Sequence, residues 1–173
     1  MSEPRSASVP DKYRVRITVI SRQQDERVEQ TSEGDLYLRG SSIYLRYHEC
    51  TPDPRHVKRR SGSDERDQAN TTNTSVMLKM NAQEWKLTRD GAVRSEMTFA
   101  LGSVRTGRYL SETLSFPLET RTHRMHRQDE PYRLEGGQEL MLPKTVRWSY
   151  DLYIEEQCTG QFDIELQIVP LSI

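Results

Sequence analysis

The sequence predicts an all-β protein, a single antiparallel up-and-down barrel of about eight to ten strands. Apolar residues recur at every second position, most clearly from Val146 to Ile154, which is typical of strands with one dry and one wet face. Turn residues such as Asp90-Gly91 separate successive alternating segments, as in a meander of hairpins. No segment shows a convincing helical period. Because a meander most easily loses its exposed edges by closing, a barrel is favoured over a two-sheet sandwich.

The expected strands follow one another with short turns between most of them. In order they cover residues 13–21, 27–38, 42–50, 74–80, 85–89, 93–99, 108–111, 115–124, 145–156 and 161–169. Gly34 interrupts the second strand and predicts a bulge or sharp bend. Asp90-Gly91 predicts a type I′ hairpin turn, because that turn needs positive φ at both central positions. Thr159-Gly160 is expected to join the last two strands, and Pro170 ends the pairing.

Three segments lack the alternation. Residues 1–12 are expected to form a disordered tail. Residues 51–73 and 126–144 are expected to be irregular insertions, since proline, glycine and mixed charges replace the strand pattern there. A single β-barrel domain would therefore cover residues 13–170.

Composition limits the classes of partner and compartment. The net charge of −1 provides no overall attraction to nucleic acid or anionic lipid. No apolar run exceeds three residues, whereas a transmembrane helix needs about 20, so no membrane partner is expected. Cys50 and Cys158 lack the spacing of a disulfide framework and indicate free thiols, hence a cytoplasmic protein. A monomer and a homodimer both remain open.

The order of several short motifs also points to a known family. These motifs are Val15-x-Ile17 with Ser21-x-Gln23, Glu33-Gly34-x-Leu36-Tyr37, Tyr44-x-x-Tyr47-x-Glu49, residues 74–79, Leu87-x-Arg89-x-Gly91, Met97-x-Phe99, Tyr109, Tyr150 and residues 164–168. In this order the chain resembles the YwiB-like family of small bacterial β-barrel proteins. The resemblance implies a calycin-like barrel, similar in outline to lipocalins and fatty-acid-binding proteins, and no particular activity. The chain departs from the family pattern in its two long insertions and at residues 111–114, where a Thr-Pro-x-Gly turn is expected.

Two charged residues fall in the phase of the apolar residues. Glu49 shares the phase of Tyr47, and Arg89 shares that of Leu87. If both point inward they need partners, because an unpaired buried charge is costly or shifts its pKa. The pair predicts a polar anchor at which Arg89 would hold a carboxylate or phosphate through its bidentate fork. Two alternatives stay open: the pair closes one mouth of the barrel, or both side chains reach solvent at strand ends.

Aromatic residues of the dry phase could line an apolar pocket for such a ligand. The candidate ligand-binding residues are Glu49, Arg89, Tyr47, Tyr109, Trp148 and Tyr150. The alternative for the aromatic residues is an ordinary packed core.

The basic exterior gives an alternative function, a module that binds protein or RNA through this surface and the insertions. Arg121, His123 and Arg127 would share one strand face, and Arg124 and His126 the other, so the two histidines do not converge on a metal. A phosphate-binding patch would need Arg105 and Arg108 as well. The basic cluster at residues 56–60 is followed by acids that largely cancel it, which makes nucleic acid a less favoured partner.

Catalytic and cofactor motifs are absent from the sequence. It contains no Gly-x-Ser-x-Gly elbow, no phosphate-binding or dinucleotide glycine loop, and no zinc-ligand spacing. No cofactor and no metal are therefore expected, and an enzyme is the least favoured class.

Overall fold

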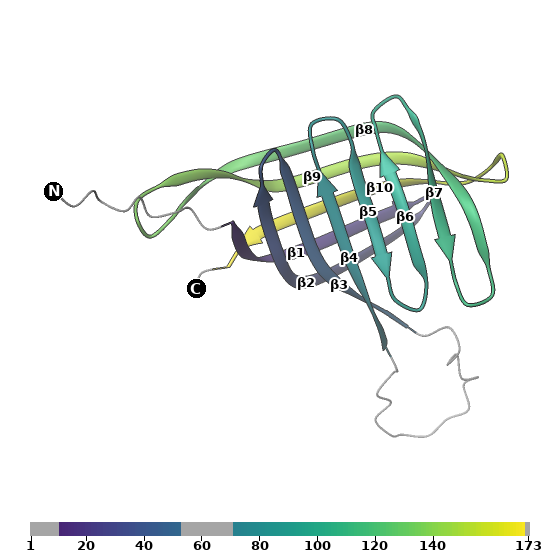
Figure 1. The fold of residues 1–173 in the computed structure, drawn as a ribbon, viewed down its shortest axis with the longest axis horizontal. Coiled ribbons are helices and arrows are strands. Elements are labelled where there is room, and N and C mark those ends of the chain that lie inside the picture. Colours follow the sequence, from purple (N-terminus) through teal and green to yellow (C-terminus); the bar gives the residue numbers. More distant parts are fainter. Residues whose placement is uncertain (1–10, 53–70, 172–173) are drawn as a thin grey trace, which may run out of the picture.

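The structure, a computed structural model, describes residues 11–52 and 71–171. Ten antiparallel strands form one closed barrel, in which each strand pairs with its neighbours in the chain and β1 closes onto β10 (Figure 1). The all-β up-and-down barrel predicted from the alternation is thus confirmed. Within the described ranges, no helix has the length and apolar character needed to cross a membrane.

Most of the strands are longer than the sequence pattern suggests. Their bounds are β1 Lys12–Gln23, β2 Glu26–Arg39, β3 Ser42–Pro52, β4 Thr71–Met80, β5 Trp85–Asp90, β6 Arg94–Phe99, β7 Val104–Leu110, β8 Ser115–Arg133, β9 Glu139–Ile154 and β10 Gln157–Pro170. Lys12, expected in a disordered tail, begins β1, while residues 1–10 lie outside the described chain. Of the expected insertion at residues 51–73, both ends belong to β3 and β4, and residues 53–70 are outside the description.

The expected irregular insertion at residues 126–144 is wrong. β8 and β9 continue through it as a single hairpin that turns at residues 134–138 and projects from the barrel as a two-stranded arm (Figure 1). The register of this pair shifts between Thr122 and Arg124 and again between Gln128 and Asp129. Each shift changes which residues face the core, so no single alternation runs through the segment.

Two of the predicted turns also differ. The β5–β6 hairpin exists, but its register closes at Asp90 and Arg94, which leaves three residues in the loop in place of a two-residue type I′ turn. β9 and β10 are joined at Glu155 and Glu156, both with positive φ, and not at the expected Thr159-Gly160. Glu-Glu lacks the residue chemistry typical of such a turn, so no sequence pattern indicated it.

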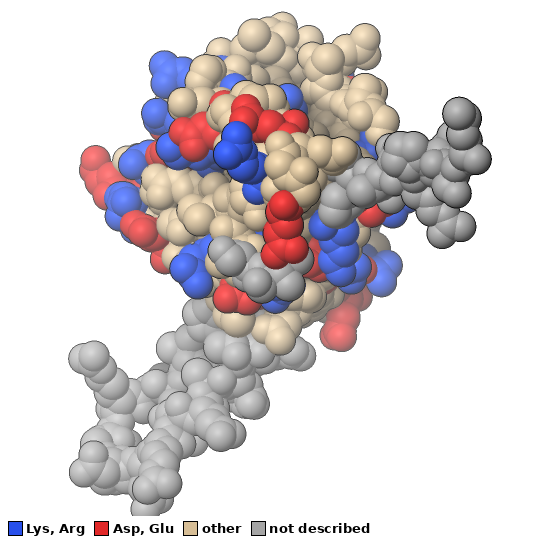
Figure 2. All heavy atoms as spheres, turned by 90° about the vertical axis from the view of Figure 1, so that its left-hand side faces the viewer, with Lys and Arg blue, Asp and Glu red and all other residues tan. Residues whose placement is uncertain are grey.

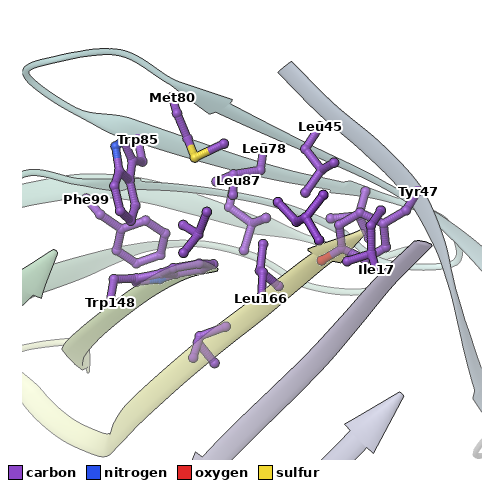
Figure 3. Close-up of a cluster of buried hydrophobic side chains, with 14 of the residues drawn as sticks. Ile17, Leu45, Tyr47, Leu78, Met80, Trp85, Leu87, Phe99, Trp148 and Leu166 are labelled. Atoms are coloured by element: carbon purple, nitrogen blue, oxygen red, sulfur yellow. The ribbon is translucent and has the colours of Figure 1, made fainter. Parts of the chain in front are cut away.

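The barrel interior is filled with apolar side chains (Figure 3). Val15, Ile17 and Leu78 have no exposed surface. Trp148 is 1% exposed, and its ring packs edge-on against Trp85 at 5.8 Å between ring centroids. This core is concentrated away from the barrel end at which β3 and β5 terminate, and that end carries the polar residues considered next.

Candidate functional site

The strand register places Arg89 in a row of residues that face the barrel interior. Directly paired residues of antiparallel strands lie on the same face of the sheet. Pairing across β3 to β8 gives the row Tyr47, Val76, Arg89, Ser95, Tyr109 and Phe116. Tyr47 and Val76 are buried, at 3% and 0% exposed, which identifies the row as an inner one. Arg89 therefore points inward from β5, as its phase in the sequence predicted.

Arg89 and Glu49 form an ion pair at this end of the barrel. Arg89 Nε donates to Glu49 Oε2 at 3.2 Å, and the Tyr47 hydroxyl donates to Glu49 Oε1 at a longer 3.5 Å. The side chain of Arg89 is 31% exposed and that of Glu49 only 13%. The pair is therefore neither sealed in the core nor free in solvent. Both side chains point inward, and both can be reached from the barrel mouth.

Burial and charge set the protonation of the groups around this pair. Burial is the largest influence on Arg89 and opposes its charge, but the Glu49 carboxylate together with Tyr47 and Tyr150 outweighs burial and raises the pKa of Arg89. Burial raises the pKa of Tyr150 to about 12, with the charge on Arg89 acting in the opposite direction. Burial raises the pKa of Tyr47 by more than that of Tyr150, and the neighbouring Glu49 carboxylate adds to this effect. At neutral pH the site thus holds one cation, its counter-ion and neutral phenols.

Two stacked aromatic pairs lie near the same end of the barrel. The Tyr150 ring stacks on Phe162 at 5.2 Å between centroids, and the Tyr109 ring stacks on Phe116 at 4.6 Å. Within the described part of the chain, no residue hydrogen-bonds the Tyr150 hydroxyl. Trp148, the remaining predicted site residue, lies in the packed core described above and borders neither cleft described below.

A cleft of about 250 Å³ opens through the barrel wall beside Glu49. It is lined by Val19, Gln30, Thr31, Ser32, Tyr47, His48, Glu49 and Cys50. The cleft exists because pairing between β2 and β3 stops at Gly34 and Tyr47, while β2 stays paired with β1 and β3 with β4. We call this opening, between residues 26–33 of β2 and 48–52 of β3, the seam. The sequence signal for it was Gly34, which the structure shows as the end of β2–β3 pairing and not as a bulge.

Of the two predicted basic faces of β8, the one with Arg124 and His126 is confirmed, whereas the one with Arg121, His123 and Arg127 is wrong because of the register shift at His123. After it, Arg124 and His126 lie opposite Ser149 and Arg147 on the outer face, whereas Arg127 lies opposite the core residue Val146. His123 Nε2 instead lies 2.7 Å from the buried Asp151 carboxylate, a contact that no sequence pattern indicated.

Carboxylates are interspersed with the arginines on the outer surface. Arg147 pairs with Asp163 at 3.5 Å, and Arg22 pairs with Glu165 at 3.8 Å. Figure 2 shows the same mixture of positive and negative side chains on one face of the molecule. A second cleft, of about 260 Å³ and bordered by Arg94 and Arg108, also contains Asp90 and Glu96. The exterior therefore offers mixed charge where the sequence suggested a basic patch.

Metal-binding side chains do not cluster in the described ranges. No three His, Cys, Asp or Glu residues there approach one another closely enough to hold a metal ion. Cys50 and Cys158 are exposed free thiols, and Cys50 Sγ lies 3.3 Å from Asn73 Oδ1.

Comparisons with known proteins agree with this architecture. The family model described as "Domain of unknown function (DUF1934)" matches residues 64–166. The crystal structure of the ywiB protein from Bacillus subtilis superposes with a TM-score of 0.65 over 94% of this chain and 95% of that one, at 17% sequence identity. This likeness shows a shared fold and confirms the resemblance to the YwiB-like family. No curated protein matches the chain. Since the family model covers more than half of the 173 residues, the chain belongs to the DUF1934 family.

Proposed function

We propose that the barrel binds a small ligand through an anionic group held by Arg89. One observation carries this proposal: Nε of Arg89 donates to Glu49, whereas no described residue accepts a hydrogen bond from its two terminal nitrogens. A guanidinium fork of this kind matches a carboxylate or phosphate bidentately. The 31% exposure of the side chain leaves the fork accessible to a small molecule.

Glu49 would keep Arg89 in place without filling its binding capacity. Its carboxylate compensates the charge on Arg89 in the free protein, so the cation is stable before any ligand arrives. Because the contact uses only Nε, an incoming anion replaces water at the terminal nitrogens and does not have to displace Glu49.

The tyrosines would supply the remaining contacts. Tyr150 has a hydroxyl without a described partner, and the charge on Arg89 lowers its pKa against the effect of burial. The half-buried ring of Tyr109, stacked on Phe116, offers an apolar surface for the uncharged part of the molecule. These features support a ligand that combines an anionic group with an apolar body.

Native mass spectrometry of gently purified protein, compared with its denatured mass, tests the proposal. We expect a discrete excess mass that is lost on denaturation and is absent from the Arg89→Met variant. Arg94→Met is the matched control, because Arg94 lies on the adjacent strand, is exposed and, among the described residues, pairs only with Asp90. An excess mass that persists in folded Arg89→Met would contradict the proposal.

If the purified protein carries no ligand, benzoate and inorganic phosphate serve as probes. We expect NMR titration to shift the signals of residues around Arg89 in the unmodified protein and in Arg94→Met, but not in Arg89→Met. Equal shifts in all three proteins, or none in any, would overturn an anion site at Arg89.

A further inference from the structure

Within the described chain, the seam leaves two strand edges without backbone partners. β2 pairs with β1 down to Glu26, but its pairing with β3 covers only Gly34 to Arg39. β3 pairs with β4 as far as Pro52, again without β2 beyond Tyr47. Among the described residues, none pairs with the seam side of residues 26–33 or of residues 48–52.

The register shows which backbone groups of β2 face the seam. Gln23 and Glu26 flank the two-residue turn between β1 and β2, so they form a hydrogen-bonded pair. Every second residue of β2 from Glu26 onward therefore directs its N–H and C=O to β1. The residues between them direct their backbone groups the other way, and these are Arg27, Glu29, Thr31 and Glu33. Asp35, the next in this series, lies opposite Arg46 of β3, which confirms the direction.

This edge lacks most of the features that normally protect an exposed strand. Proteins protect such edges with proline, β-bulges, charged side chains or a covering segment. Residues 26–33 contain no proline, and their register with β1 has no shift. The charges are compensated locally, because Arg27 pairs with Glu29 at 2.8 Å and Glu33 pairs with Arg14 at 3.4 Å. The backbone of β2 is therefore available to a further strand.

The cleft beneath the seam adds a side-chain preference. Its volume of about 250 Å³ is enough for a long side chain. Glu49 is the only acidic or basic residue, other than His48, among those that line it. The contact of Glu49 Oε1 with Tyr47 is long, at 3.5 Å, which leaves acceptor capacity on that oxygen. A cationic side chain pointing inward would complement this carboxylate.

We propose that the seam is a docking site for an extended segment of a partner protein. The segment adds a strand along the edge of β2 and points a Lys or Arg side chain into the cleft toward Glu49. In strand addition, main-chain hydrogen bonds supply affinity and alternate side chains supply specificity. This interaction shares Glu49 with the ligand site above, but it is distinguishable from ligand binding, because it uses the backbone of β2 and does not need the terminal nitrogens of Arg89.

A capped heptapeptide, acetyl-Thr-Val-Thr-Lys-Thr-Val-Thr-amide, is the probe for this proposal. Its caps remove the terminal charges, so Arg89 has no carboxylate to bind. We expect the peptide to slow amide hydrogen exchange at Arg27, Glu29 and Thr31 in NMR spectra of the full chain. Replacing the central Lys with norleucine should weaken binding roughly tenfold, as expected for loss of a charged hydrogen bond. Glu49→Gln should abolish that preference.

Thr31→Pro tests the backbone contact, and Thr31→Val is its matched control. Both variants lose the 3.2 Å contact between the hydroxyls of Thr18 and Thr31, but only proline removes the amide that faces the seam. Proline is tolerated at a strand edge when its missing N–H is not used in the ladder. We expect Thr31→Pro to raise the dissociation constant roughly fivefold or more, while Thr31→Val leaves it unchanged.

Peptides methylated on backbone nitrogens keep the test decisive if Thr31→Pro fails to fold. Methylation of alternate amides on the β2-facing edge should abolish binding, whereas methylation on the other edge should weaken it less. Lack of binding at millimolar peptide, binding without protection at the seam, or equal binding to folded Thr31→Pro and Thr31→Val would overturn the proposal. A concentration-dependent dimer that Thr31→Pro dissociates would also overturn it, by showing that a second copy of the chain covers the edge.

Arg89→Met separates this proposal from the ligand proposal. The variant should lose benzoate or phosphate binding and keep the protection that the capped peptide gives to Thr31. Loss of peptide binding in folded Arg89→Met would contradict the independence of the two sites.

Discussion

Arg89 and Glu49 are the residues at which stability and the proposed function meet. A half-buried ion pair gains from a lower local dielectric but loses hydration on both charges, so its net contribution is modest. Removing one partner is more harmful than removing both, because the remaining charge then lacks compensation inside the barrel. Here the effect should be larger for loss of Arg89, since Glu49 is the less exposed partner.

A double-mutant cycle measures this coupling. We expect Arg89→Met to lower the free energy of unfolding by about 1–3 kcal/mol, because it leaves the Glu49 carboxylate without its cation. The double variant Arg89→Met with Glu49→Leu should be less destabilised than the sum of the single variants, as determined by urea unfolding. Strict additivity would show that the contact contributes nothing to stability.

The raised pKa of Tyr150 predicts that the protein loses stability at alkaline pH. Its folded-state pKa of about 12 lies above its ordinary value of 10.0, because burial disfavours the phenolate. This contribution is complete below pH 10, and it disappears as the pH rises toward 12, since only the unfolded state ionises in that window. The free energy of unfolding should fall by about 2 kcal/mol across this range, as measured by thermal unfolding at each pH. The fall should be smaller in Tyr150→Phe, which has no hydroxyl to ionise. An unchanged alkaline profile in Tyr150→Phe would contradict the shift.

Gly34 determines where β2 and β3 can approach one another. A Cβ at this position would collide with the carbonyl oxygen of Arg46 and lie 2.9 Å from Ile17 Cδ1. The backbone oxygen cannot yield as a flexible side chain can. Glycine is therefore required by the close packing of β1, β2 and β3 just above the seam.

Gly34→Ala should lower the free energy of unfolding by about 1–3 kcal/mol, the usual range for overpacking. Gly136→Ala is the control, because a Cβ there meets no atom within 4 Å and Gly136 does not have positive φ. Chemical unfolding of both variants checks the expectation, and equal stabilities would show that the strands can separate without loss.

The β8–β9 arm depends on the barrel for its order. An isolated two-stranded hairpin is marginally stable in water. Tyr132 on the arm packs edge-on against Tyr13 of β1, at 6.2 Å between ring centroids, and Leu140 and Leu142 also face the core. These contacts, rather than the strand pairing alone, hold the arm against the rest of the molecule.

Tyr132→Ala should therefore loosen the arm without unfolding the barrel. We expect faster amide exchange within residues 128–144 and unchanged exchange in β4 and β5, with a loss of about 1 kcal/mol. The exposed Arg133 provides the control, as Arg133→Ala removes no contact with the core. Uniformly faster exchange throughout the barrel would show that the arm is part of its global cooperative unit.

For the molecule as a whole, closure joins the two ends of the chain. β1 pairs with β10 from Val15 opposite Pro170 to Gln23 opposite Phe162, whereas the other contacts are mostly between consecutive strands. Closing so long a loop carries a large entropic cost before its contacts form. Local hairpins are therefore expected to form before the β1–β10 pair.

Folding kinetics test this order. Ile17→Ala, at the closure, should mainly accelerate unfolding, whereas Leu87→Ala, in the β5–β6 hairpin, should mainly slow folding. Stopped-flow refolding and unfolding of both variants would measure the difference. A larger slowing of folding in Ile17→Ala would show that closure occurs in the transition state.

The sequence by itself determined the fold class and placed Arg89 and Glu49 in the phase of the inward-facing residues. Both follow from period-two alternation, because side chains on a regular strand alternate between two faces whatever the rest of the molecule does. The same reasoning failed for Arg127 and for residues 126–144, since each register shift in β8 exchanges the two faces. It also missed the contact of His123 with Asp151, which depends on one of those shifts.

Only the tertiary structure decided how these residues combine. The alternation could not show that Arg89 uses a single nitrogen on Glu49, or that Trp148 belongs to the packed core. Nor could it show that β2 and β3 separate below Gly34, because the extent of pairing depends on the curvature and closure of the whole barrel. Alternation is a local property of the chain, whereas distances between strands are fixed only when all ten close together.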